Sequence, residues 1–356
     1  MSEDIFWRLF DRAISLDEGF PVDLHSRWIK RHSIDDAELM AKADVESIKL
    51  SLINSAAIIR FDERHYFGVA GLEEPQTLPS GLKQIDITPG LFASFVVEVG
   101  LDASATAAEI RDIVEGFSSV DNDYQGHDLS DVANLFPKIL FYEVNQSYVY
   151  ARTIERILGS YISRGYSGGP LSFKSDTLIE IATFFENGSD WIPFSLPLRG
   201  MFSFSWDGLF LDLYRCIEQL YAVPRITRLT EKWATSESII NLAKLLEDVL
   251  SWRPKEDESL ELLFRDLDVE LCKDIRDGFQ FVTVKESSSN PSIVASKRMY
   301  ALRNSCVHFR PTTQNKKITD PQWNRIISLM LKIIGDLYHK FGRRFHQEET
   351  SIAVIS

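Results

Sequence analysis

The sequence predicts an α+β fold with two parts, a mixed N-terminal domain in residues 1–200 and an all-helical domain in residues 204–346. In the first part, short runs of apolar and β-branched residues typical of strands alternate with helical periodicity. From about residue 205, apolar residues recur three and four positions apart, which is the spacing of amphipathic helices. The length of 356 residues is sufficient for two domains, each with its own core.

The N-terminal domain combines predicted helices with short predicted strands. Helical spacing covers residues 4–14 and 105–117. Three runs have the composition of strands, and the last of them reads as a buried strand: residues 56–61, 65–70 and 91–99. Glycine, serine and proline in residues 161–170 predict a loop.

The C-terminal domain is predicted to be a helical bundle. Its segments with helical spacing are residues 206–222, 236–252, 258–278, 292–309 and 320–345. Pro311 ends the fourth segment, because proline lacks the amide hydrogen that continues a helix. Asp320 and Pro321 suit the N-cap and the first position of the last helix. A polar set in the first segment is interpreted as a solvated helix face: Asp212, Arg215, Glu218 and Gln219.

The net charge of −13 argues against nucleic-acid binding, but the charge is unevenly distributed. Residues 1–200 hold 17 basic against 31 acidic residues, whereas residues 297–344 hold eleven basic against two acidic residues. Such asymmetry is typical of a phosphate-binding surface on a protein that acidic residues keep soluble. A basic helical face that pairs with the acidic stretch 256–277 inside one bundle explains it equally well.

The sequence also indicates the cellular compartment and the absence of a metal site. Cys216, Cys272 and Cys306 are widely spaced, which is typical of reduced, buried thiols and not of a disulfide frame or a zinc site. No cofactor-binding motif is found. The N-terminus is acidic, and no run approaches 18 uncharged apolar residues. A cytoplasmic protein with no metal, no cofactor and no membrane partner is therefore expected.

The candidate active residues lie on the predicted helix 292–309. At about 100° per residue, Arg303 falls at the edge of the apolar stripe, while Asn304 and His308 share the opposite face. Arginine can neutralise a phosphate, and histidine can transfer a proton near neutral pH. Arg303 and His308 are about 140° apart, so they cannot form one compact pair on a single helix. Two copies of the helix around a two-fold axis would bring such groups together, which predicts a homodimer or a higher homo-oligomer.

The segment from Arg303 to His308 resembles the R-x(4–6)-H motif of the HEPN superfamily (higher eukaryotes and prokaryotes nucleotide-binding domains). Asn304 stands where the ribonuclease members of that family have a polar residue. The order of the helices is also similar, with the motif on a late helix that one long closing helix follows. The resemblance covers residues 204–346, less than half of the chain.

The resemblance implies metal-independent cleavage of RNA at a dimer interface. Arg303, Asn304 and His308 would be the catalytic residues, because attack of the ribose 2′-OH on the adjacent phosphate needs a proton carrier and a cation. The products would carry a 2′,3′-cyclic phosphate and a 5′-OH. Basic residues around the motif are the candidates for RNA binding: Lys297, Arg298, Arg310, Lys316 and Lys317.

Many HEPN ribonucleases act as toxins or in abortive infection, so the resemblance implies a role in antiviral defence. The N-terminal domain is interpreted as a sensing or regulatory domain that a protein or ligand trigger binds. Two alternatives stay open. The helical domain could be a catalytically inactive module for RNA binding, nucleotide binding or assembly, or the ribonuclease could be silent until its trigger binds.

Overall fold

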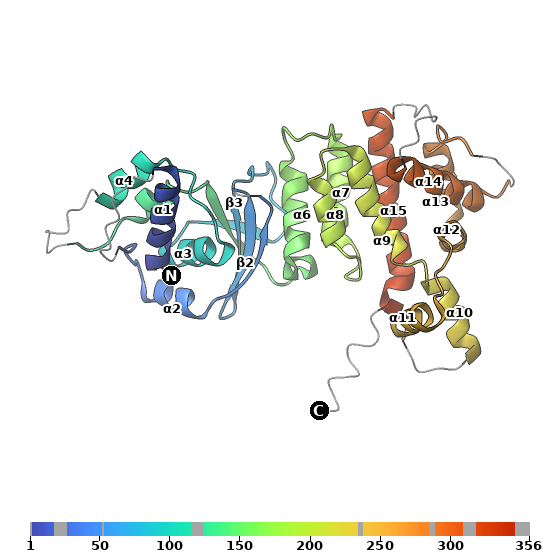
Figure 1. The fold of residues 1–356 in the computed structure, drawn as a ribbon, viewed down its shortest axis with the longest axis horizontal. Helices are drawn as coiled ribbons and strands as arrows, with labels where there is room; N and C mark the ends of the chain where they lie inside the picture. Colours follow the sequence, from blue (N-terminus) through green and yellow to red (C-terminus); the bar gives the residue numbers. More distant parts are fainter. Residues whose placement is uncertain are drawn as a thin grey trace. The chain divides into compact units, whose positions relative to one another are not determined.

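The computed structural model describes residues 2–17, 27–51, 53–115, 124–233, 238–284, 289–308 and 318–345. It confirms the α+β fold, because an N-terminal unit that contains a sheet precedes a helical unit (Figure 1). The two compact units are Met1–Gly165 and Tyr166–Ser356. In the described residues, no helix is both long enough and apolar enough to cross a membrane.

An antiparallel sheet organises the N-terminal unit. Its strands are β1 (Asp44–Lys49), β2 (Ser55–Phe61), β3 (Arg64–Ala70), β4 (Leu82–Ile85) and β5 (Ile139–Val144), in the spatial order β1-β2-β3-β5-β4. The predicted strands 56–61 and 65–70 are confirmed as β2 and β3. They pair as a tight hairpin in which Phe61 lies opposite Arg64, and Asp62 in the turn has a positive φ of 50°.

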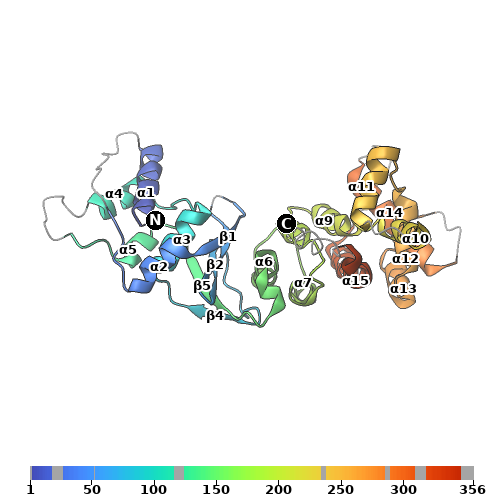
Figure 2. The ribbon, with the colours of Figure 1, turned by 90° about the horizontal axis from the view of Figure 1, so that it is seen from below.

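Helices cover both faces of this sheet. The helices of the unit are α1 (Ser2–Leu16), α2 (Ile34–Lys42), α3 (Pro89–Val99), α4 (Ala107–Glu115), α5 (Leu129–Ala133) and α6 (Ile154–Gly165), with a 3₁₀ turn at Val149–Arg152. Figure 2 shows α3 and α6 on opposite sides of the sheet. Adjacent residues of β5 point to opposite faces, so Phe141 contacts Phe95 of α3 while Tyr142 contacts Tyr161 of α6.

The prediction of a strand at residues 91–99 is wrong, because these residues belong to α3. Thr88 caps the helix by accepting a hydrogen bond from the Leu91 amide, and Pro89 occupies its first turn. Gly100 ends the helix with a φ of 66°. Nearly all of α3 is buried, so its apolar run lacks the polar face that reveals a helix by its periodicity. The predicted loop 161–170 is also corrected, since α6 continues to Gly165.

The helical unit is built around its last helix. The helices are α7 (Ser175–Asn187), α8 (Ser195–Met201), α9 (Trp206–Glu218), α10 (Val223–Trp233), α11 (Ile239–Leu250), α12 (Glu256–Arg265), α13 (Val269–Gly278), α14 (Pro291–Val307) and α15 (Asp320–Phe345). Long α15 packs against α7, α9, α11 and α13 (Figure 1). Its predicted bounds, 320–345, are confirmed. The expected N-cap at Asp320 is corrected, because Asp320 is already the first helical residue. Thr319 is the residue before the first turn, since its carbonyl accepts a hydrogen bond from the Trp323 amide.

Two differences from the sequence interpretation concern where segments begin and end. The predicted helix 206–222 ends at Glu218, and α10 follows as a separate helix that was not predicted. The sequence pattern changes near residues 200–204, whereas the compact units divide between Gly165 and Tyr166. The first 35 residues of the helical unit were assigned to the N-terminal domain, but α7 and α8 pack on α15 and α9.

Candidate functional site

Helix α14 presents the candidate residues at its C-terminal end. Asn290 caps the helix and Pro291 occupies its first turn. Ala295, Met299 and Leu302 are buried, as the predicted apolar stripe requires, and they fix α14 against α12 and α13 (Figure 1). This packing places Arg303, the next residue along the chain, at the border between the core and the solvent.

Arg303 is held by acidic and aromatic groups from two other helices. Its Nη2 donates to Oε1 of Glu218 on α9 at 3.0 Å, and its Nη1 lies 3.3 Å from Oε2 of Glu256 on α12. Its guanidinium carbon is 5.9 Å from the centre of the Tyr214 ring. The side chain is only 17 % exposed. Burial alone would lower the pKa of Arg303, but the two carboxylates outweigh it and raise this pKa.

A buried pair of tyrosines packs next to Arg303. The hydroxyl oxygens of Tyr214 and Tyr221 are 2.6 Å apart, and both rings are almost fully buried. Burial raises the pKa of both phenols, so both stay protonated at neutral pH. The tyrosines next to Arg303 are therefore uncharged and hydrogen-bonded to each other.

Asn304 contacts Arg303, whereas His308 lies apart from it. The Oδ1 of Asn304 accepts a hydrogen bond from Nη1 of Arg303 at 3.2 Å. The helix ends at Val307, so His308 is the C-cap residue and not part of the last turn. The His308 side chain is exposed, and no hydrogen bond joins it to Arg303 within the described residues. One chain thus brings Arg303 and Asn304 together, but not His308.

The interpretation of the polar set on α9 as a solvated face holds for the exposed Arg215 and Gln219 but is wrong for Asp212 and Glu218. Asp212 is buried, Glu218 binds Arg303, and Gln219 accepts a hydrogen bond from the Tyr338 hydroxyl at 3.2 Å. Sequence reasoning therefore missed Glu218 as a partner of Arg303, whereas Glu256 belongs to the acidic stretch 256–277 whose pairing with the basic face was left open. A polar residue that continues an apolar stripe is the signal that could have identified Asp212, but nothing in the sequence pairs an acid on α9 with Arg303.

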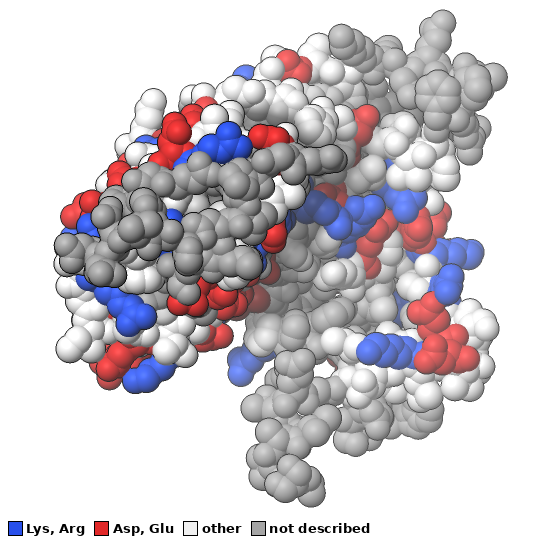
Figure 3. All heavy atoms as spheres, turned by 60° about the vertical axis from the view of Figure 1, so that its left-hand side comes forward, with Lys and Arg blue, Asp and Glu red and all other residues white. Residues whose placement is uncertain are grey.

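The basic residues of the C-terminal region contact acids of the same unit. Besides the pair of Arg303 with Glu256, Arg325 lies 3.7 Å from Asp274, whereas Lys340 forms its ion pair with Asp336 of its own helix at 2.8 Å. Glu256 and Asp274 lie in the acidic stretch 256–277, which supports a partial pairing of the basic face with that stretch. Figure 3 shows acidic and basic side chains interspersed on the face that it presents.

The candidate RNA-binding residues are only partly described. Lys297 is half-buried on α14, and Nη1 of Arg298 donates to the Arg276 carbonyl at 2.5 Å. Arg310, Lys316 and Lys317 lie outside the described residues. Arg298 is therefore tied to the end of α13 through this hydrogen bond.

The three cysteines do not form a reactive or metal-binding centre in the described part of the chain. Cys216 and Cys272 are buried, and burial raises the pKa of the Cys306 thiol to about 12, with the Asp207 carboxylate 3.5 Å away adding to the effect. Cys306 is thus a protonated thiol at neutral pH. Within the described ranges, no cluster of three histidine, cysteine, aspartate or glutamate side chains is placed to hold a metal ion.

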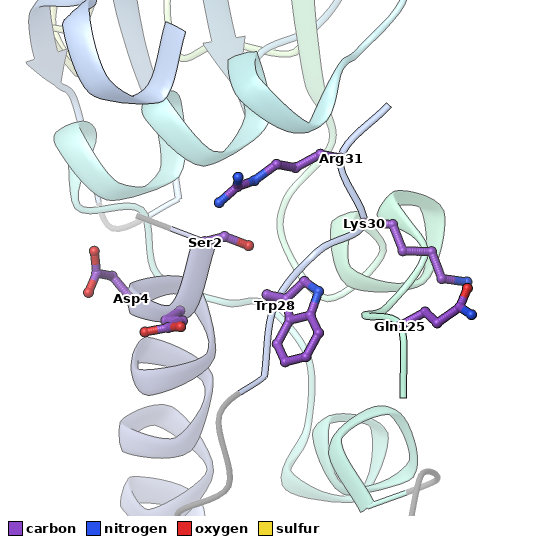
Figure 4. A pocket seen from close by; sticks show the side chains of 7 residues that line it. Ser2, Asp4, Trp28, Lys30, Arg31 and Gln125 are labelled. Atoms are coloured by element: carbon purple, nitrogen blue, oxygen red, sulfur yellow. The ribbon is translucent and has the colours of Figure 1, made fainter. Parts of the chain in front are cut away.

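The N-terminal unit has a cavity of about 800 Å³ (Figure 4). Its lining mixes acidic, basic and aromatic side chains: Ser2, Glu3, Asp4, Trp28, Lys30, Arg31 and Gln125. Lys30 is paired with Asp128 at 3.0 Å. The lining is thus mainly polar and carries charges of both signs.

No family model, no curated protein and no solved structure matches this chain. The site must therefore be interpreted from its own geometry and chemistry.

Proposed function

We propose that the helical unit is a HEPN-type, metal-independent endoribonuclease that acts as a homodimer or a higher homo-oligomer. The observation that carries the proposal is the placement of Arg303. Its guanidinium is fixed by Glu218, Glu256 and Tyr214 near the end of α14, Asn304 follows it directly, and the exposed His308 lies five positions further along the chain. A guanidinium and an imidazole supply the two functions that cleavage of RNA without a metal requires, once a second copy brings them together.

In the proposed reaction, the ribose 2′-OH attacks the adjacent phosphorus and the bond to the 5′-oxygen breaks. His308 carries the proton between these two oxygens, and the planar fork of Arg303 binds the phosphate. Asn304 orients Arg303, since its Oδ1 accepts a hydrogen bond from Nη1 of Arg303. The products are a 2′,3′-cyclic phosphate and a 5′-OH, and DNA resists because it lacks the 2′-OH.

The separation of Arg303 and His308 within one chain supports a site that two copies share. Arg303 faces the carboxylates of α9 and α12, whereas His308 at the end of α14 is exposed. Val307 next to it is an apolar side chain that is 46 % exposed. In a two-fold pair, the partner's His308 would face Arg303, and each site would use groups from both chains.

One observation favours the alternative of a catalytically inactive binding or assembly module. Two carboxylates already neutralise Arg303, so a phosphate must compete with Glu218 and Glu256 for the same guanidinium. In the inactive module, Arg303 would only join α9, α12 and α14. Its substitution would then lower the stability of the protein, and the protein would not cleave RNA with or without Arg303.

The test is incubation of total RNA in EDTA with the wild type and with the His308→Ala variant, followed by analysis of the fragment ends. We expect the wild type alone to produce cyclic-phosphate ends, with cleavage by His308→Ala reduced at least about 100-fold, the lower range for a lost proton carrier. His339→Ala is the matched control, because His339 is also an exposed histidine of this unit.

Equal cleavage by the wild type and His308→Ala would contradict the proposed site, and no cleavage by either would favour the inactive module or a ribonuclease that needs its trigger.

We propose a role as a toxin in antiviral defence, with the N-terminal unit binding the trigger; its 800 Å³ cavity is where a ligand trigger would fit. The same variants test the proposed role as a toxin in cells. Expression of the wild type and of His339→Ala should arrest growth, whereas expression of His308→Ala should not.

A further inference from the structure

A buried carboxylate between α8 and α9 fixes two arginines at the surface. The Asp212 side chain is only 7 % exposed. It accepts hydrogen bonds from Nε and Nη2 of Arg199 at 3.0 and 2.6 Å, and from Nη1 of Arg215 at 2.5 Å. Because the carboxylate cannot move into water, the positions of both guanidinium groups are fixed.

The two arginines keep a net positive charge and most of their donors. Their side chains are 57 % and 52 % exposed, and one carboxylate compensates only one of the two charges. Within the described residues, Arg199 uses two of its five N–H donors for Asp212 and Arg215 uses one. The other donors of these half-exposed side chains can bind a phosphate, which a guanidinium does through two parallel hydrogen bonds.

Two phenylalanines lie next to these arginines on the connection between α8 and α9. Phe204 is 91 % exposed and Phe202 is 37 % exposed. Phe204 directly precedes Ser205, the N-cap of α9, and follows Arg199 of α8 by five positions, so the ring and both arginines belong to the α8–α9 pair of helices. An almost fully exposed aromatic ring on the same pair of helices as two fixed guanidiniums is the combination that binds single-stranded nucleic acid, through base stacking and phosphate contacts.

Close packing of α8 on α9 maintains this geometry. A Cβ added at Gly200 would lie 2.7 Å from Cδ1 of Leu209, so only glycine allows α8 to approach α9 so closely. Ser205 caps α9, because its Oγ accepts a hydrogen bond from the Gly208 amide at 3.2 Å. Arg199 and Phe204 are thus positioned by the turn between two rigid helices.

We propose that the α8–α9 surface, which consists of Arg199, Phe202, Phe204 and Arg215, binds single-stranded RNA. Phosphates bind the two guanidiniums, and a base stacks on Phe204. The proposal deepens the proposed ribonuclease function, because Arg215 lies about one turn before Glu218, which holds Arg303. RNA bound to this surface would lead along α9 towards Arg303.

The chemistry of the surface favours RNA over a lipid bilayer. Only two exposed rings contribute apolar area, whereas insertion into the membrane interface requires a long apolar helix face. The guanidiniums are held by a buried carboxylate instead of extending freely, which suits directional contacts to phosphate. Binding to vesicles is therefore an outcome that the test must distinguish.

The test is fluorescence anisotropy of a labelled 12-nucleotide oligouridine with the full chain in EDTA. The His308→Ala background prevents cleavage by the proposed site, and the readout needs no enzymatic activity, so it remains valid if the protein is not a ribonuclease. The variants are Arg215→Ala, Arg215→Lys and Phe204→Ser. Arg265→Ala and Ile179→Ser are matched controls, because Arg265 is 54 % exposed and also pairs with an acid, while Ile179 is 62 % exposed.

We expect Arg215→Ala and Phe204→Ser each to weaken binding about ten-fold, with both controls unchanged. Arg215→Ala should also reduce the slope of log affinity against log salt by about 0.7, and Arg215→Lys should retain that slope while it loses affinity. Unchanged binding in both Arg215→Ala and Phe204→Ser would overturn the proposal. Binding to vesicles of phosphatidylcholine and phosphatidylserine that these variants lose, while RNA binding persists, would overturn it as well.

Discussion

His127 lies in the core of the N-terminal unit, where a charged imidazole has almost no access to water. Only 1 % of the residue is exposed, and its ring centre is 5.0 Å from that of Phe6. Burial, together with Arg27 and Lys30, lowers the pKa of His127 to about 4, against the opposing effect of Asp131 and Asp128. The imidazole is therefore neutral in the folded protein at physiological pH.

This burial should make the N-terminal unit sensitive to mild acid. Below pH 6.5 the unfolded chain protonates His127 while the folded chain does not, so the free energy of unfolding falls by about 1.4 kcal/mol per pH unit, down to about pH 4. Between pH 7 and pH 5, urea titrations should show a loss about 2 kcal/mol larger in the wild type than in His127→Gln. The same loss in both proteins would show that His127 is protonated in the core.

At the residue scale, the sequence placed Arg303 correctly but could not provide its surroundings. The apolar spacing of α14 predicted that Arg303 lies beside Leu302 at the edge of the buried stripe. Glu218 and Glu256 precede it by 85 and 47 positions, so their contacts depend on how α9 and α12 pack. Helical periodicity describes one helix at a time and contains no information on such pairs.

At the scale of elements, the close approach of α3 to the sheet depends on a glycine. A Cβ at Gly68 of β3 would lie 2.7 Å from the Phe95 ring of α3 and 2.8 Å from the Phe141 ring of β5. Both rings are fully buried and cannot move aside without displacing their neighbours. Gly335 of α15 is the opposite case, because a Cβ there would meet nothing within 4 Å.

These two glycines should respond in opposite ways to the same substitution. Gly68→Ala is expected to lower the free energy of unfolding by about 1–3 kcal/mol through overpacking. Gly335→Ala should raise it by about 0.5–1 kcal/mol, since alanine is the better helix former. Chemical denaturation of both variants measures this difference, and a stabilised Gly68→Ala variant would mean that α3 does not pack on β3 at this distance.

The long helix that was predicted with correct bounds has one polar and one apolar face. Helix α15 shows its periodicity over 26 residues, and its bounds were recovered from the sequence alone. Helix α3 is buried over nearly all its length, so its composition resembled a buried strand. Helix α10 was not predicted, although Pro224 lies in its first turn, where proline is tolerated.

At the scale of the whole molecule, the two compact units each have a core of their own. The core of the N-terminal unit is formed by α1, α3 and the sheet, and that of the helical unit surrounds α15. We therefore expect a chain that ends at Gly165 and a chain that begins at Tyr166 each to unfold cooperatively, with far-ultraviolet circular dichroism spectra that add up to that of the full protein. Loss of cooperative unfolding in either part would show that one core needs the other unit.

The strand order of the sheet also has a consequence for the protein as it is synthesised. In the described sheet, β4 pairs with β5, which follows it roughly 60 residues later in the chain. At the usual rate of translation, β5 leaves the ribosome about 3–12 s after β4. The hairpin of β2 and β3 can close during this interval, while β4 has to wait for the strand that will separate it from β3.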